Sequence, residues 1–68
     1  MPYGFEAKGE VYDLTDLYDT IEDTLTRDTQ ADYWLDILGE IFADALATLE
    51  KGFAYTLPNG VKLRPVGD

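Results

Sequence analysis

The sequence predicts a single α+β domain, with an N-terminal extended segment, two antiparallel helices and a C-terminal β-hairpin packed on the longer helix. Two helical apolar periodicities in the middle of the chain, and a Pro-Asn-Gly turn between two alternating runs near its end, indicate this fold. The chain has 68 residues, which is the size of one small domain spanning residues 1–68. Such a domain buries only about 60% of its unfolded surface, so it depends on efficient apolar packing.

The N-terminal segment, residues 3–12, reads "YGFEAKGEVY" and mixes aromatic and β-branched residues with Gly4 and Gly9. This composition is typical of extended structure. Two arrangements fit the segment: one edge strand, or a loose hairpin bent at Lys8-Gly9.

The first helix is predicted over residues 13–27. Its apolar residues recur at helical spacing: Leu14, Leu17, Tyr18, Ile21 and Leu25. They span roughly 100° of the helix, a narrow stripe that docks on one neighbour. Asp13 or Thr15 can cap the start, and Arg27 suits the negative end of the helix dipole.

The second helix is predicted over residues 28–51, from a capping-box-like pair, Thr29 and Asp32, to the terminal glycine Gly52. Its apolar residues are Trp34, Leu35, Ile37, Leu38, Ile41, Phe42, Ala45, Leu46 and Leu49. They cover roughly 180° of the helix, more than one narrow helix can bury. The remainder must meet the sheet, a second copy of the chain or a partner, so a homodimer is one expectation.

The C-terminal hairpin, residues 53–66, offers two registers around "TLPNG". A two-residue Asn59-Gly60 loop would place Leu57 opposite Lys62, which mixes both faces. A three-residue loop, Pro58-Asn59-Gly60, pairs Leu57 with Val61 instead.

The three-residue loop gives one wholly apolar face, which is expected to cover the long helix. Its members are Phe53, Tyr55, Leu57, Val61 and Leu63, with Tyr55 opposite Leu63 and Phe53 near Pro65. Because a slip of one residue would move every side chain to the wrong face, this register is favoured. Lys62 and Arg64 then stand together on the solvent face, where charges on an edge strand deter pairing between molecules.

The charge balance narrows the possible functions. Fourteen acidic residues stand against five basic ones, for a formal net charge of −9. Such a charge repels a nucleic-acid backbone and attracts basic surfaces, so the expected partner is the basic surface of another protein, with no direct nucleic-acid contact.

The residue types in the sequence exclude further classes of function. The chain has no Cys and no His, which excludes a thiolate or imidazole zinc site and a Cys or His nucleophile. No two of the acids stand out as a catalytic pair, and no segment has the pattern of a calcium loop. No apolar run is long enough to span a membrane, and the N-terminus lacks the pattern of a secretory signal. We therefore expect no catalytic residue, cofactor, metal or membrane contact, and a cytoplasmic location.

The acidic residues of the second helix recur every four positions: Asp32, Asp36, Glu40 and Asp44. Four residues rise about 6 Å along a helix, so the row extends about 18 Å. The first helix adds Asp16, Asp19 and Asp23 on its outer side, and Tyr33 lies beside the acids of the second helix. Two such helices side by side could mimic the phosphates of DNA, although solvated helix faces explain the same pattern.

These observations favour a small acidic inhibitor that occupies a basic site, such as a nucleic-acid-binding site, on a target protein. The predicted partner-binding residues are Asp16, Asp19, Asp23, Asp32, Tyr33, Asp36, Glu40 and Asp44. In size and charge, the chain resembles the short acidic inhibitors that bacteriophages make against host nucleases, restriction systems, CRISPR complexes or polymerases. A structural or assembly module, whose acidity serves only solubility, is the alternative. An antitoxin for a basic toxin would use the same physics as the inhibitor.

Overall fold

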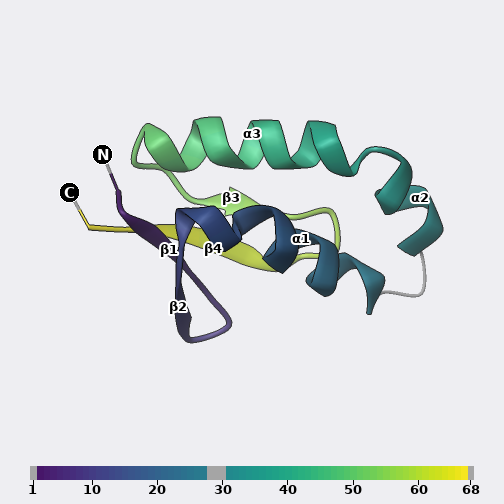
Figure 1. The fold of residues 1–68 in the computed structure, drawn as a ribbon, viewed down its shortest axis with the longest axis horizontal. Helices are drawn as coiled ribbons and strands as arrows, with labels where there is room; N and C mark the ends of the chain where they lie inside the picture. The colour runs from purple at the N-terminus through teal and green to yellow at the C-terminus, as the bar shows by residue number, and fades with distance from the viewer. Residues whose placement is uncertain (1, 28–30, 68) are drawn as a thin grey trace.

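The protein has two layers, a four-stranded antiparallel sheet and a layer of helices that covers one of its faces (Figure 1). The computed structural model describes residues 2–27 and 31–67. The molecule measures 34 × 22 × 18 Å. Both chain termini lie at the same end, because β1 and β4 are neighbouring antiparallel strands. The α+β fold with terminal strands and central helices is therefore the one predicted.

The N-terminal segment forms a hairpin with one strand inside the sheet and the other at its edge. β1 (Gly4–Ala7) pairs with β2 (Glu10–Asp13) on one side and with β4 (Lys62–Val66) on the other, and the strand order is β2-β1-β4-β3. The hairpin alternative is thus confirmed and the single edge strand is wrong. Lys8 and Gly9 form the bend with positive φ angles of 54° and 85°, the backbone of a type I′ turn.

The first predicted helix forms in two parts, a 3₁₀ turn (η1, Leu14–Asp16) followed by α1 (Leu17–Thr26). Asp13 sits at the start of the 3₁₀ turn but makes no side-chain capping hydrogen bond, so this capping prediction is wrong. Of the apolar stripe, Leu17, Ile21 and Leu25 are fully buried.

The second predicted helix is also divided, because α2 (Ala31–Asp36) ends before α3 (Leu38–Glu50) begins. At the break, Ile37 has φ −115° and ψ 19°, and its N–H donates to the carbonyl of Trp34 at 3.1 Å, a tighter 3₁₀-type bond. The predicted unbroken helix over 28–51 is therefore wrong at this point. The predicted cap at Thr29 lies outside the described residues.

The end of α3 follows the prediction. Gly52 takes a left-handed φ of 88°, its N–H donates to the carbonyl of Leu49, and the N–H of Phe53 donates to the carbonyl of Thr48. These two bonds form a Schellman motif, which explains why a glycine follows the helix.

The C-terminal hairpin adopts the three-residue loop. The N–H of Leu57 donates to the carbonyl of Val61 at 2.8 Å, and the N–H of Gly60 donates to the carbonyl of Leu57 at 2.9 Å. Gly60 takes a φ of 94°, and the side chain of Asn59 accepts a hydrogen bond from the N–H of Val61. In β3 (Tyr55–Thr56), Tyr55 stands opposite Leu63, as the favoured register requires.

One residue of the predicted apolar hairpin face, Phe53, does not join the core and is 65% exposed. Pro65 explains why Phe53 is exposed. The hydrogen-bonded pairs alternate along the hairpin, so the pair after Tyr55–Leu63 would be Phe53–Pro65, and proline has no N–H to donate. The ladder stops there, and β3 is only two residues long.

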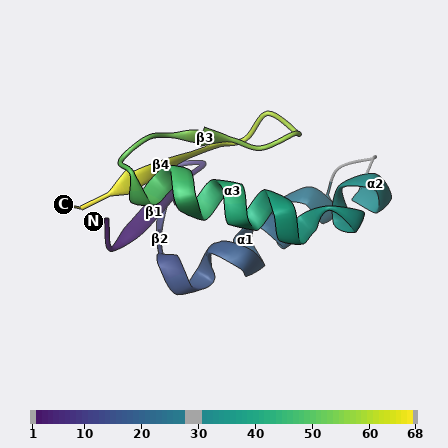
Figure 2. The ribbon, with the colours of Figure 1, turned by 90° about the horizontal axis from the view of Figure 1, so that it is seen from above.

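The core lies between the sheet and the helices, which both pack on the same side of the strands (Figure 2). Its buried residues are Phe5, Ala7, Leu17, Ile21, Leu25, Leu38, Ile41, Ala45, Leu49, Leu57 and Leu63. We call this side of the sheet the core face and the other side the open face. The open face presents Glu6, Lys62 and Arg64, so both cations of β4 point to solvent as predicted. Among the described residues, no helix has the length and apolar character needed to cross a bilayer.

Candidate partner-binding surface

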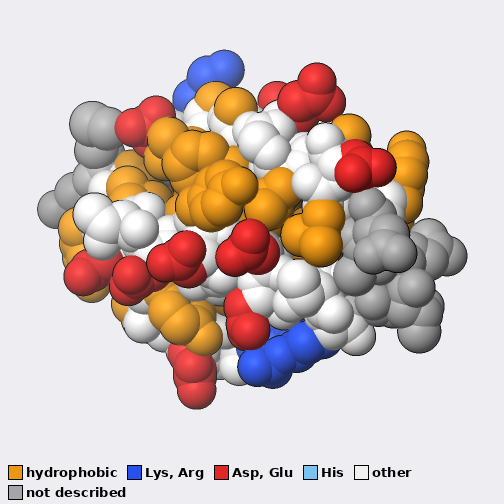
Figure 3. All heavy atoms as spheres, turned by 45° about the vertical axis from the view of Figure 1, so that its right-hand side comes forward, with side chains coloured by type: hydrophobic (Ala, Val, Ile, Leu, Met, Phe, Trp, Pro, Cys, Tyr) orange, Lys and Arg blue, Asp and Glu red, His pale blue; other side chains and the backbone are white. Residues whose placement is uncertain are grey.

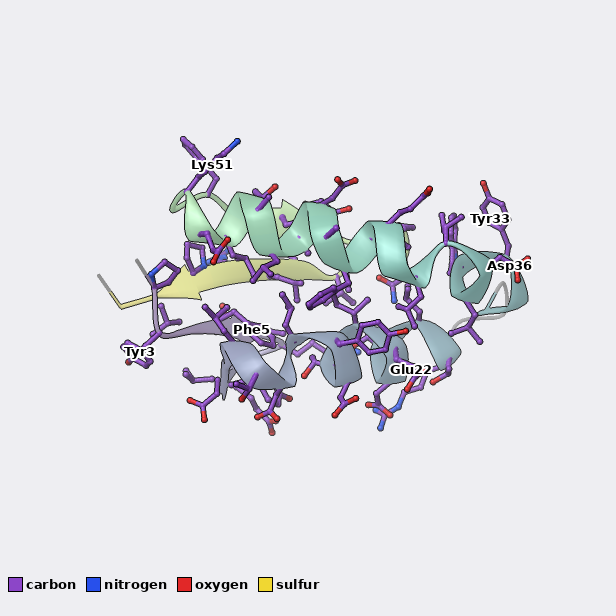
Figure 4. The ribbon with its side chains drawn as sticks, turned by 45° about the horizontal axis from the view of Figure 1, so that its top comes forward. Tyr3, Phe5, Glu22, Tyr33, Asp36 and Lys51 are labelled. Carbon is purple, nitrogen blue, oxygen red and sulfur yellow. The ribbon has the colours of Figure 1, made fainter. Side chains whose placement is uncertain are left out.

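The carboxylates of α1 and α3 point in opposite directions, because the two helices lie side by side and part of each apolar side, at Tyr18 and Phe42, faces the other helix. Figure 4, which looks onto the helical layer, shows oxygen-tipped side chains leaving α1 on its lower side and α3 on its upper side. The predicted acidic residues therefore fall into separate groups: one beside the β1–β2 hairpin, one beside β3 and one at the α2 end.

The first group lines a groove between α1 and the β1–β2 hairpin. Asp16, Asp19 and Asp23 form one wall of this groove, which encloses about 330 Å³. Its other lining residues are Ala7, Lys8, Tyr12, Thr20, Thr24 and Arg27. The groove lies between α1 and the hairpin that carries the edge strand β2. The structure thus brings together all three acids predicted on the first helix.

The cations in the groove neutralise only part of its charge. Arg27 pairs with Asp23 at 3.2 Å, four residues away on the same helix. Both side chains are largely exposed, so this ion pair contributes little to stability. No other ion pair forms among the described residues, so Asp16 and Asp19 have no cationic partner in that part of the chain. The groove therefore keeps a negative wall.

Tyr12 lies against this wall, half-buried, with its ring stacked on Phe5 at 5.3 Å between centroids. Its hydroxyl donates a 2.7 Å hydrogen bond to the carboxylate of Glu10. That hydrogen bond, with smaller contributions from burial and nearby carboxylates, raises the pKa of Tyr12 above the usual 10.0. The ring of Tyr12 thus presents a flat apolar surface to the groove.

An apolar seam runs along the outer surface between α1 and α3. We define it as Leu14, Tyr18, Phe42 and Leu46. The rings of Tyr18 and Phe42 meet edge to face across the two helices, with centroids 5.4 Å apart, and Tyr18 is 42% exposed. Leu14, Phe42 and Leu46 are half-buried and pack against the core. Figure 3 shows apolar side chains gathered in the middle of one side of the molecule, with carboxylates around them.

The second acidic group, Glu40 and Asp44, is exposed on α3. Asp44 lies toward β3, since its charge acts on Tyr55: burial, and then the negative charge of Asp44, raises the pKa of Tyr55. These two acids are therefore on the flank away from the groove. The break at Ile37 separates them from Asp36, so the predicted acidic row is interrupted.

The third group lies at the α2 end of the molecule, where Figure 4 shows Tyr33 and Asp36 projecting outward. Tyr33 is 60% exposed, and its ring packs against that of Trp34 at 4.6 Å between centroids. Trp34 is half-buried against the core, as predicted for the apolar arc. Asp32 belongs to α2, but its side chain lies outside the described residues.

The open face of the sheet is different in charge. Three of the five basic residues, Lys8, Lys62 and Arg64, surround a shallow hollow of about 310 Å³ together with Glu6 and Val61. Lys62 and Arg64 thus lie on the side of the molecule opposite the helices, and Lys8 borders both this hollow and the groove. In the described part of the chain, no cluster of three or more acids is close enough to hold a metal ion.

Sequence analysis missed the residues that complete the groove and the seam. Tyr12, Thr20 and Thr24 were assigned to the strand and the helix without a shared site, and Tyr18 was assigned to the buried stripe. The alternation along residues 10–13 could have indicated that Tyr12 faces the core, but not that α1 would lie beside it.

Comparisons with known proteins gave no match: no protein-family model, no curated protein and no solved structure is similar to this chain.

Proposed function

We propose that the protein is a small acidic binding protein that acts by occupying a basic site on a target protein, as an inhibitor of the phage type would. The observation that carries the proposal is the seam. Partly exposed apolar residues, centred on Tyr18 and Phe42, lie between two acidic flanks, while Lys62 and Arg64 lie on the other side of the molecule.

This arrangement supplies the two components of a protein-binding surface. Carboxylates on both flanks attract a cationic surface over a distance and speed association. The aromatic and aliphatic side chains of the seam provide apolar contact area, which slows dissociation because water is excluded from it. A basic groove that normally holds nucleic acid has the matching charge, so competition with nucleic acid is the expected mode of inhibition.

The proposal is tested by capturing partners from a cell lysate on the immobilised protein, identifying them, and measuring their affinity at low and high salt. Reversing Asp36 and Glu40 to Lys is expected to abolish binding and leave the fold intact, because both side chains are exposed. Binding of the unchanged protein should also weaken steeply between about 50 and 500 mM salt, as screening shortens the reach of the charges.

The matched control reverses Glu50 to Lys at the far end of α3 and is compared with Glu40→Lys, which changes the net charge by the same amount on the proposed surface. This control should retain most of the binding. Equal loss in both variants, or an affinity that salt leaves unchanged, would contradict a surface-specific acidic interaction.

The alternative prediction, an assembly module, leads to the opposite expectation for the effect of salt. If the seam joins two copies of the chain, the protein will sediment as a dimer at micromolar concentration and remain one at high salt. The acidic flanks oppose this, because a two-fold contact through the seam would bring like charges together.

A further inference from the structure

The free edge of β2, beside the acidic groove, is the second feature of the molecule suited to a partner. β2 is the outermost strand of the sheet, and Glu10, Val11 and Asp13 are all exposed. Val11 is 60% exposed although it is a β-branched apolar residue. The strand therefore offers both backbone and side chains to solvent.

The register shows which backbone groups of β2 are free. In a type I′ hairpin, the residues next to the turn form a hydrogen-bonded pair, so Ala7 bonds to Glu10 and, two residues on, Phe5 bonds to Tyr12. Val11 lies between these pairs, and its N–H and C=O point away from β1. The N–H of Asp13 points the same way. These groups can pair with another strand.

The other edge of the sheet cannot accept a strand in the same way. β3 has two residues, and the ladder it forms with β4 ends at Pro65. The residues that precede β3 leave the sheet, with Phe53 exposed. Strand addition is therefore restricted to β2.

We propose that β2 accepts an extended basic segment of the partner as a fifth, antiparallel strand, with alternate Lys or Arg side chains entering the groove. The proposal rests on the function proposed above and specifies the partner's chemistry. Side chains alternate across a strand. Partner residues that bond to Val11 therefore place their side chains on the open face, and the residues on either side place theirs toward Asp16 and Asp19.

The charge of the groove and of β2 indicates which kind of segment can pair with this strand. The groove and the edge strand together carry five carboxylates, on Glu10, Asp13, Asp16, Asp19 and Asp23, against the two cations of Lys8 and Arg27. Arg27 is already paired with Asp23. A second copy of β2 would bring another acidic edge to this place, which like-charge repulsion opposes. A segment with basic residues at alternate positions fits both the free backbone and the carboxylates.

The test uses the intact protein and a capped Lys-Val-Lys-Val-Lys peptide as the probe. In the proposed register, the valines turn their N–H groups toward β2 and the lysines turn theirs away. N-methylation of the valines should weaken binding at least about tenfold, since it removes a hydrogen bond and adds a clash at the edge. N-methylation of the lysines should leave the affinity nearly unchanged, and the amide of Val11 should gain protection from hydrogen exchange in the complex.

Paired variants test the groove. Asp16→Asn with Asp19→Asn should weaken peptide binding, whereas Glu22→Gln with Glu50→Gln, which removes the same charge at two exposed positions outside the groove, should not. If both methylated peptides, or both charge variants, behave alike, the strand proposal is overturned, while salt-sensitive capture of basic partners would still support the proposed function. If the peptide does not bind while basic partners are captured, strand addition alone is overturned.

Discussion

The core face and the open face of the sheet carry opposite side chains, although their residues alternate along the same strands. On the core face, Phe5 and Leu63 are completely buried by the helices. On the open face, their neighbours Lys62 and Arg64 remain in solvent, and Glu6 is half-buried. Adjacent residues of one strand thus serve the core and the charged surface in turn, so substitutions at neighbouring positions should change the stability by very different amounts.

The largest expected difference is between Leu63→Ala and Lys62→Ala. Leu63 lies at the centre of the core and is 0% exposed, so truncating it should lower the free energy of unfolding by about 2–5 kcal/mol. Truncating Lys62 should change it by less than about 0.5 kcal/mol, because its side chain is exposed. Urea denaturation followed by circular dichroism measures both. A comparable loss at the two positions would show that the open face is covered in solution.

A smaller difference is expected between two glycines, one in the sheet and one in a helix. A Cβ on Gly4 would collide with the backbone carbonyl of Tyr12 in the neighbouring strand. Since the pairing of β1 with β2 holds the two backbones together, Gly4→Ala should cost about 1–3 kcal/mol of stability.

Gly39 is the matched control. A Cβ there meets nothing within 4 Å, and the residue lies on the exposed side of α3. Gly39→Ala should therefore stabilise the protein, by up to about 1 kcal/mol, through its higher helix propensity. Thermal unfolding of the two variants should shift in opposite directions, and a shift in the same direction would contradict this account of Gly4.

The register that separates the two faces was predictable from the sequence, because only one loop length puts Leu57, Val61 and Leu63 on a common side. The helical stripe at Leu17, Ile21 and Leu25 was predictable for the same reason. Both follow from local periodicity, which the folded chain has to satisfy to bury its apolar residues.

Other features depend on tertiary contacts that periodicity does not contain. The break at Ile37 falls within a continuous apolar pattern, and no Pro or capping residue marks it. The exposure of Phe53 follows from the missing N–H of Pro65 twelve residues later, which matters only once the strands are paired. The groove required the β1–β2 hairpin to lie beside α1, so the acids of α1 and α3 could not be assigned to different flanks from helical wheels alone.

The turn that sets the register gives the next prediction. Gly60 has a φ of 94°, and a Cβ there would meet nothing within 4 Å, so only backbone strain opposes a larger residue. Gly60→Ala should cost about 1–2 kcal/mol, the penalty of a left-handed conformation for an L-residue. The crystal structure or the nuclear Overhauser contacts of the variant should still pair Tyr55 with Leu63. A change of register would show that the apolar face alone does not fix the alignment.

The smallest expected effect concerns the hydrogen bond from Tyr12 to Glu10 at the edge of the core face. Because this bond raises the pKa of Tyr12 in the folded protein above its unfolded value, its contribution to stability is fully present below about pH 10 and is lost as the pH rises through the folded pKa. Ultraviolet titration should show Tyr12 ionising above the usual pKa of 10.0. Glu10→Gln should lower the pKa of Tyr12, since the amide carries no charge to oppose the phenolate. An unchanged pKa of Tyr12 in this variant would show that its hydroxyl does not donate a hydrogen bond to Glu10 in solution.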